Sequence, residues 1–261
     1  MKLRKKRSNS KVKIGKKLNK KKQSEKNKKI DEKLKRVSSG IKKFDKMTSG
    51  GFEENSTNLV IGGDGSGKTI FAMSFLIEGI KRGENVLYIN FEESKENFFR
   101  NMLGLGWDLS KFESSGRFTF LEYSPEKIKM MIDEGGGVVE EIILKNKIKR
   151  LVIDSLTSFL ILFPSKQLKR QAISSLFNLI EKWDCTSILT LQEFSEEIKN
   201  KRDSEAESQA DSIILLYLIK VKNERKRFIE VLKMRGTRHS TGTYEFKIKK
   251  GIEIGNKKII K

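Results

Sequence analysis

Residues 62–69 read Gly62-Gly63-Asp64-Gly65-Ser66-Gly67-Lys68-Thr69, and this stretch decides the fold. It matches the pattern G-x-x-x-x-G-K-[ST] and lies between an apolar run of strand length and an amphipathic run of helical period, which is the context that the pattern requires. Glycines let backbone N–H groups turn inward around phosphates at a helix N-terminus, where the helix dipole favours anions. The stretch therefore predicts a phosphate-binding loop, or P-loop.

Two side chains of the P-loop carry the predicted chemistry. We expect Lys68 to reach the β- and γ-phosphates of ATP, and the hydroxyl of Thr69 to bind Mg²⁺. Asp64 adds a carboxylate to the loop, and we expect this negative charge to weaken nucleotide binding.

Apolar runs of strand length alternate with helical patterns on the C-terminal side of the loop. The predicted strands cover residues 58–61, 86–91, 118–121, 150–154 and 187–191, and the predicted helices cover 68–80, 95–105, 126–145 and 165–183. This order predicts an α/β fold with a mainly parallel sheet and helices on both faces. Four further strands, at 212–221, 225–233, 242–248 and 252–254, are closely spaced and predict an antiparallel hairpin extension at the sheet edge.

Two acidic positions follow predicted strands. Asp154 ends the apolar run 151–153, at the carboxyl edge of the sheet where open α/β folds bind ligands, so we expect it to hold the Mg²⁺ shell. Glu92 and Glu93 end the strand after the P-loop helix. Glu93 is the better candidate for polarising the attacking water, with Glu92 supporting it, although acids also favour the first turn of a helix for structural reasons.

The charge of the chain is uneven. Residues 1–36 hold 18 Lys or Arg against three acids, and the other residues carry a net charge of only +6 out of +21. Repelling lysines with few apolar neighbours predict a disordered tail over 1–36 and an ATPase domain over 37–261. The tail is interpreted either as a non-specific nucleic-acid-binding segment or as a solubilising extension.

Composition excludes several classes. One cysteine, Cys185, permits no intrachain disulfide and no thiolate metal cluster, and it fits a buried residue at the start of a strand. No apolar run is long enough to span a bilayer, and no secretory signal follows the basic N-terminus. We therefore expect a cytoplasmic protein with no membrane partner.

Longer stretches resemble the KaiC-like branch of the RecA superfamily, over about residues 37–255. The stretches are Val37-Ser38-Ser39-Gly40-Ile41 with Gly50-Gly51-Phe52, then residues 83–94, Ile153-Asp154-Ser155-Leu156, residues 210–216 and Leu232-Lys233-Met234-Arg235-Gly236-Thr237-Arg238-His239. The resemblance implies a RecA-like core with a single KaiC domain of archaeal type. It also implies an ATP- and Mg²⁺-dependent ATPase whose assembly or partner binding follows its nucleotide state.

The resemblance further implies roles for individual residues. The paired glutamates, Glu93 above all, act on the hydrolytic water. Lys233 and Arg235 contact the γ-phosphate bound by a neighbouring subunit of a hexameric ring, and His239 lies near the ribose. Alternation along a strand puts Lys233 and Arg235 on one face, with no acid close by in sequence, and predicts two unpaired cations. A solvated basic hairpin and a structural histidine are the alternatives.

Gln192, at the end of the strand 187–191, instead resembles the γ-phosphate-sensing glutamine of the recombinases, so a recombinase-related DNA-binding ATPase stays open. The following residues, 193–211, are acidic and lack glycine, which argues against a DNA-binding loop there. Autophosphorylation, suggested by Ser208 near Asp211, is a third alternative.

Overall fold

The computed structural model describes residues 35–192 and 205–259. Nearly all of these belong to one compact unit over 37–261. The predicted tail, apart from its last two residues, and most of the acidic stretch after Gln192 lie outside the described residues. The boundary at residue 36 stays a prediction.

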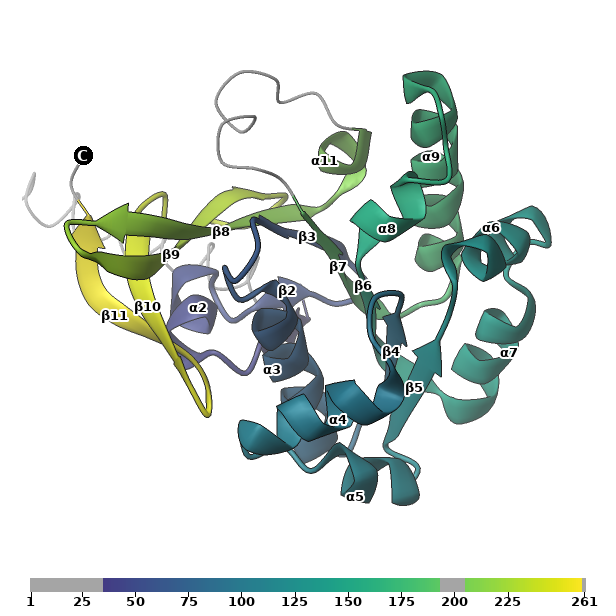
Figure 1. Ribbon diagram of the computed structural model, residues 1–261, viewed down its shortest axis with the longest axis horizontal. Helices are drawn as coiled ribbons and strands as arrows, with labels where there is room; N and C mark the ends of the chain where they lie inside the picture. Colours follow the sequence, from purple (N-terminus) through teal and green to yellow (C-terminus); the bar gives the residue numbers. More distant parts are fainter. Residues whose placement is uncertain (1–34, 193–204, 260–261) are drawn as a thin grey trace, which may run out of the picture. The chain divides into compact units, whose positions relative to one another are not determined.

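The strands and helices alternate as expected (Figure 1). The strands are β1 (Arg36–Val37), β2 (Phe52–Glu53), β3 (Thr57–Gly62), β4 (Asn85–Asn90), β5 (Phe118–Glu122), β6 (Ile148–Asp154), β7 (Thr186–Leu191), β8 (Ser212–Val221), β9 (Glu224–Met234), β10 (Thr243–Lys249) and β11 (Gly251–Ile259). The helices are α2 (Lys42–Met47), α3 (Lys68–Lys81), α4 (Lys95–Gly104), α5 (Leu109–Ser114), α6 (Pro125–Asp133), α7 (Gly137–Asn146), α8 (Leu156–Leu160), α9 (Lys166–Lys182) and α11 (Glu205–Gln209).

Nine strands form one sheet in the order β11-β10-β9-β8-β3-β7-β6-β4-β5, and β1 with β2 forms a small second sheet. The six strands from β8 to β5 run parallel, whereas β9, β10 and β11 are antiparallel to their neighbours. The predicted α/β fold class is confirmed. One detail differs, because β8 pairs in parallel with β3 and only its other edge begins the antiparallel extension.

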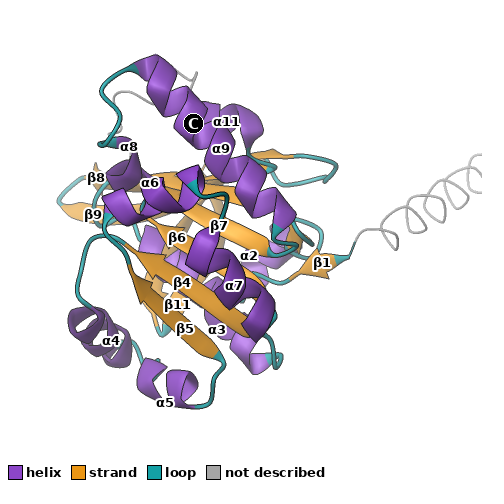
Figure 2. Ribbon diagram, turned by 90° about the vertical axis from the view of Figure 1, so that its right-hand side faces the viewer, coloured by secondary structure: helices purple, strands orange, loops and turns teal. Residues whose placement is uncertain are grey.

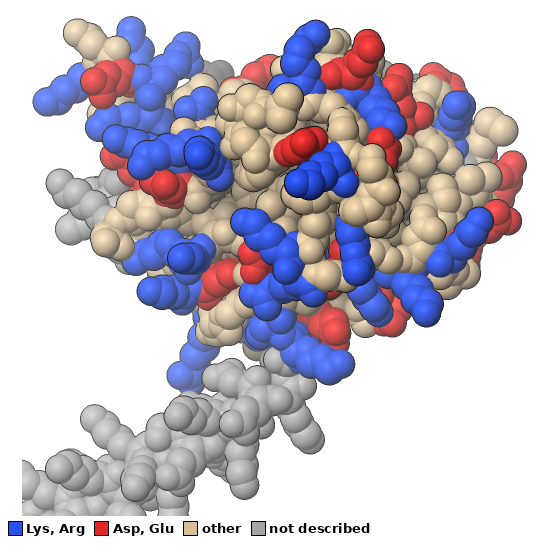
Figure 3. Space-filling view, turned by 90° about the horizontal axis from the view of Figure 1, so that it is seen from below, with Lys and Arg blue, Asp and Glu red and all other residues tan. Residues whose placement is uncertain are grey.

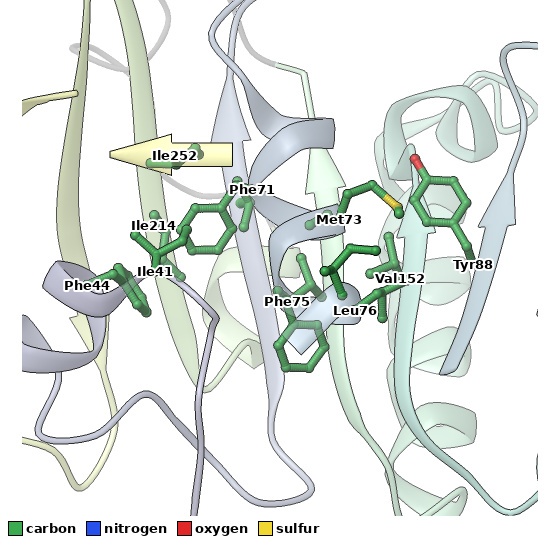
Figure 4. Packing of buried hydrophobic residues seen from close by; sticks show 14 of the residues in the cluster. Ile41, Phe44, Phe71, Met73, Phe75, Leu76, Tyr88, Val152, Ile214 and Ile252 are labelled. Carbon is green, nitrogen blue, oxygen red and sulfur yellow. The ribbon is translucent and has the colours of Figure 1, made fainter. Parts of the chain in front are cut away.

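The central strands are buried on both faces because helices cover the two sides of the sheet (Figure 2). Alternate residues of β3 separate accordingly: Val60 packs with α3, whereas Leu59 and Ile61 pack with α9. Figure 4 shows part of the first cluster, where Phe71 and Phe75 of α3 meet the sheet. This two-sided burial holds the carboxyl ends of β3, β6 and β7 at one edge.

Cys185 is buried just before β7, as predicted, and burial raises the pKa of its thiol to about 12.

One predicted helix, over 126–145, is two helices in the structure. Gly135, Gly136 and Gly137 all have positive φ angles and separate α6 from α7. The left-handed conformation that glycine tolerates ends the first helix and reorients the chain.

Candidate nucleotide-binding site

The P-loop joins β3 to α3 and leaves the start of the helix open. Gly65 and Gly67 have φ angles of 69° and 104°, in the region that other residues rarely adopt. Gly67 is the N-cap of α3 and supplies no side-chain cap to the first N–H groups. The first N–H groups of this 14-residue helix, which no N-cap side chain accepts from, favour an anion in front of the loop.

Lys68 lies across the mouth of the loop. Its Nζ donates hydrogen bonds to the carbonyl oxygens of Gly62, at 2.8 Å, and of Gly63, at 3.1 Å. Burial lowers the pKa of this ammonium group, and three nearby carboxylates act against that effect: Asp154, Asp64 and Glu92. Because carbonyl oxygens are its hydrogen-bond acceptors, the ammonium group can move to a phosphate without breaking an ion pair.

Asp154 ends β6 and is the meeting point of four elements. Its Oδ2 accepts hydrogen bonds from Thr69 Oγ1 of α3, at 2.8 Å, and from Tyr88 of β4, at 2.5 Å. Its Oδ1 accepts one from Thr190 of β7, at 2.5 Å. Burial, followed by the charge of Asp154, raises the pKa of Tyr88 well above its usual value, so the phenol stays a donor. The sequence pattern predicted the acid and the threonine, but not the two hydroxyls that orient the carboxylate.

The two glutamates occupy different surroundings. Glu92 lines the cavity at the P-loop, and its Oε1 accepts hydrogen bonds from Ser155, at 2.6 Å, and Ser158, at 3.1 Å. Glu93 is half-buried and accepts a hydrogen bond from Asn101, at 3.1 Å. Burial raises the pKa of Glu93, and the Asn101 bond partly offsets this. Glu93 is not among the residues that line the cavity, so its catalytic role stays a prediction.

Gln192 reaches the P-loop from the end of β7. Its Nε2 donates a hydrogen bond to Asp64 Oδ1 at 2.8 Å, and both residues line the cavity. The Gln192 backbone N–H donates to Thr157 Oγ1 at 2.7 Å, which fixes the start of the side chain. Gln192, which resembles the recombinase glutamine, is therefore hydrogen-bonded to the acid of the P-loop.

A cavity of about 320 Å³ joins these groups. It is lined by Asp64, Gly65, Gly67, Lys68, Thr69, Ile70, Glu92, Asp154, Ser155, Gln192, Arg227 and Ile248. Two of these residues were not predicted from the sequence: Arg227 of β9 and Ile248 of β10. Arg227 Nε donates to the carbonyl oxygen of Gly65 at 2.9 Å. No local pattern marks these residues, since only the hairpin topology brings them to the loop.

The cations predicted on β9 are not unpaired. Lys233 Nζ donates to the carbonyl oxygens of Glu207, at 2.9 Å, and Ser208, at 3.2 Å. Arg235 forms an ion pair with Asp211 at 3.3 Å and donates to Ser208 O at 2.7 Å. The prediction of unpaired cations was wrong because Ser212 pairs with Met234, which brings residues 207–211 beside the end of β9.

Lys233, Arg235 and His239 do not line the cavity of their own chain. Burial, followed by the charge of Arg235, lowers the pKa of Lys233. The ring of His239 contacts the carbonyl oxygen of Thr237 at 3.2 Å. Their predicted contact with a neighbouring subunit's nucleotide therefore stays a prediction.

The residues at the loop fit a nucleotide with Mg²⁺. Ser66 Oγ is buried without a hydrogen-bond partner in the described part of the chain, although it belongs to the loop that faces the anion site. Thr69 and Asp154 offer the hard oxygen ligands that Mg²⁺ prefers, and they touch each other. Within residues 35–192 and 205–259, no cluster of three or more His, Cys, Asp or Glu side chains could hold a metal by itself. A site of this kind takes its remaining ligands from phosphates and water.

A P-loop on a mainly parallel sheet, with an acid at the end of β6, defines the class of RecA-like P-loop ATPases. The family model "ATPase: KaiC" matches residues 37–259, and the chain belongs to this family. It is therefore an ATP-binding protein of the KaiC type, as the sequence resemblance implied.

Individual relatives agree with this assignment. The chain is 34% identical to the circadian clock protein KaiC3 of Synechocystis over 85% of its own length and 46% of that protein. It is 34% identical to the UPF0273 protein of Thermotoga maritima, over 85% of this chain and 96% of that one. The chain thus spans about half the length of the clock relatives that it matches, but nearly the whole length of the Thermotoga protein.

The fold has a counterpart among solved structures. The crystal structure of a KaiC-like protein from Pyrococcus horikoshii superposes with a TM-score of 0.75 at 32% identity, covering 85% of this chain and 99% of that chain. Among the helices described here, none is long and apolar enough to cross a membrane.

Proposed function

We propose that this protein is a Mg²⁺-dependent ATP hydrolase whose assembly or partner binding is controlled by its nucleotide. The observation that carries the proposal is the contact of Thr69 with Asp154 at 2.8 Å, beside Lys68 and the open N-terminus of α3. Hydrolysis needs these three functions together: a metal site, a fixed cation and backbone donors for the phosphates.

Each residue has a defined task in this proposal. Lys68 exchanges its loop carbonyls for phosphate oxygens, and Arg227 supports the loop at Gly65. Thr69 and Asp154 would hold Mg²⁺, which neutralises charge on the phosphates when bound. Glu93, or Glu92 beside it, orients and polarises the water.

The assembly part of the proposal depends on Lys233 and Arg235. Both donate to Ser208 O, so they reach the same side of β9, and neither lines the chain's own cavity. A second copy in head-to-tail contact would place them at its nucleotide, and such contacts close into rings when the rotation allows. We expect hexamers by resemblance. For this contact, the two cations must leave Ser208.

Sizing the protein with and without ATP and Mg²⁺, alongside measured turnover, tests the proposal. ATP-dependent oligomers that hydrolyse ATP are expected. A monomer under both conditions, with no turnover, would contradict the proposal.

A mixing experiment tests the trans contact directly. Lys68→Ala subunits keep Lys233 and Arg235, and Arg235→Ala subunits keep the P-loop. Mixed oligomers should recover part of the turnover that each variant lacks alone. If the mixture is as inactive as each variant alone, the trans contact is contradicted. Arg235 would then act within its own subunit, where it pairs with Asp211.

A recombinase-related function is favoured by one observation, the position of Gln192 in the cavity. A measurement of turnover with and without DNA distinguishes this function from the one proposed above.

Autophosphorylation has less support, since Ser208 does not line the cavity of its own chain, and its hydroxyl donates to Glu205 O at 2.9 Å.

A further inference from the structure

The tips of the two C-terminal hairpins concentrate the positive charge of the folded unit. We call this group the hairpin-tip cluster: Lys220, Lys222, Arg225, Lys226, Arg227, Lys247, Lys249 and Lys250. Three acids, Glu224, Glu245 and Glu253, lie among these eight cations, so the cluster has a net charge of +5. Residues 37–261 together carry +6, so nearly all of this excess lies at one end of the sheet. Figure 3 shows many Lys and Arg side chains at its left edge, the side on which Figure 1 places β8 to β11.

The strand register places like charges opposite each other. Lys220 pairs with Arg225 across β8 and β9, and both side chains are exposed. Like charges directly opposite on neighbouring strands destabilise a sheet. Within the described residues, two ion pairs form in the cluster, from Lys226 to Glu245 at 3.6 Å and from Lys249 to Glu253 at 2.7 Å, and neither involves Lys220 or Arg225. The pair Lys220 and Arg225 therefore opposes folding stability, and an external anion would relieve the repulsion.

A cleft opens beside this pair. The pairing of β9 with β10 ends at Arg227 and Phe246. Beyond these residues lies a cavity of about 310 Å³, lined by residues 224–227 of β9 and 245–248 of β10. Strand edges that no longer pair with each other offer backbone N–H donors in addition to the cations. The cleft thus suits an extended anion.

The cleft adjoins the nucleotide cavity, because the two share lining residues. Arg227 and Ile248 line both, and Arg227 also donates to the P-loop carbonyl of Gly65. A ligand in the cleft and a nucleotide at the loop would therefore contact the same arginine, so their binding should be coupled.

We propose that the hairpin-tip cluster binds the phosphodiester backbone of a nucleic acid beside the nucleotide site. A repeating polyanion matches cations spread over four strand segments, whereas a single bound anion would need only two or three of them. The residues lining the cleft include no exposed aromatic side chain for base stacking, so binding is to the backbone and independent of sequence. The net charge of +15 on residues 1–36 favours the same class of ligand.

Fluorescence anisotropy with a labelled oligothymidylate tests the site in the full-length chain, over a series of salt concentrations. The variant Lys220→Gln/Arg225→Gln removes the opposed pair and leaves Arg227 intact. We expect roughly a tenfold loss of affinity and a decrease in the slope of log K against log salt of about 1.4, from two lost contacts with single strands. Because the substitution also removes repulsion, the thermal midpoint should stay the same or rise, which distinguishes lost binding from unfolding.

The matched control is Arg170→Gln/Lys182→Gln, which removes the same two charge types from exposed positions of α9. It should bind as the wild type does. Wild-type affinity and salt slope in the hairpin variant would overturn the proposal, as would equal losses in both variants. Competition by polyglutamate as effective as that by unlabelled oligothymidylate would also overturn it, in favour of an acidic protein partner.

Discussion

The parallel and antiparallel halves of the sheet differ in burial and in what they contribute to the nucleotide cavity. Strands β3 and β7 are buried along their whole length, and their ends carry the P-loop and Gln192. Strands β9 and β10 keep a half-exposed, strongly charged surface, and they contribute Arg227 and Ile248 to the same cavity. One half therefore fixes the phosphate site, whereas the other completes it from a charged, half-exposed edge.

The largest effect concerns the packing of the parallel half. Arg150 is 1% exposed, pairs with Glu84 at 2.5 Å and donates to the carbonyl oxygens of Ser38 and Phe75. Arg150→Ala should lower the free energy of unfolding by about 3 kcal/mol, because it leaves these partners unsatisfied. Denaturant unfolding measures this. Arg82→Ala, which breaks an exposed ion pair with Glu78, is the control and should cost under about 0.5 kcal/mol. Similar losses in both would mean that the buried arginine does not support the sheet.

Lys68→Ala tests the phosphate site itself. The variant loses the one P-loop cation, so affinity for labelled ATP should fall by a hundredfold or more, equivalent to at least about 2.7 kcal/mol. Unfolding should be nearly unchanged, since the ammonium group contacts only two loop carbonyls. Undiminished ATP affinity in a folded variant would disprove the assignment of the loop.

Glu93→Gln separates chemistry from binding. A glutamine keeps the shape but polarises water poorly, so turnover should fall by roughly a hundredfold while ATP affinity persists. Burial raises the pKa of Glu93, and a base works only when deprotonated. Turnover should therefore rise as the pH passes upward through a value above the usual glutamate range, and this limb should vanish in the variant. If Glu92→Gln shows these effects instead, the glutamate that lines the cavity is the base.

The smallest effect is expected at the P-loop acid. Asp64→Asn removes a negative charge beside the phosphate site but retains an acceptor for Gln192. ATP affinity should increase a few-fold, and ADP affinity less, because the extra phosphate of ATP gains more from the lost repulsion. Calorimetric titration of both nucleotides measures the difference. Equal or weaker binding of ATP would show that Asp64 does not oppose the nucleotide.

Much of the parallel half could be predicted from the sequence, because its strands are continuous apolar runs and its loop is a local motif. Asp154 followed from its place at the end of such a run. The break between α6 and α7 was missed although three glycines mark it, since the apolar period continues on both sides. Helices α5 and α8 were also missed, because five or six residues carry too little periodicity.

The antiparallel half was predictable as strands, but its contacts with the rest of the chain were not. Asp211 precedes Arg235 by 24 residues, and Gly65 precedes Arg227 by 162, so no local pattern reveals either contact. Such pairings depend on the strand order, which places β8 between β3 and β9. The apolar alternation of these strands indicated which of their residues are buried. The contacts of their charged residues depend on tertiary structure.

The position of β3 has a consequence for synthesis on the ribosome. Val60, three residues inside the strand that leads to the P-loop, pairs with Thr190 on one side and Ile214 on the other. Both partners are translated more than a hundred residues later. The P-loop is therefore synthesised early, before β3 has the neighbouring strands with which it pairs. We therefore expect nucleotide to stabilise the growing polypeptide only after residues near 216 have left the exit tunnel, because β3 then has both of its neighbouring strands.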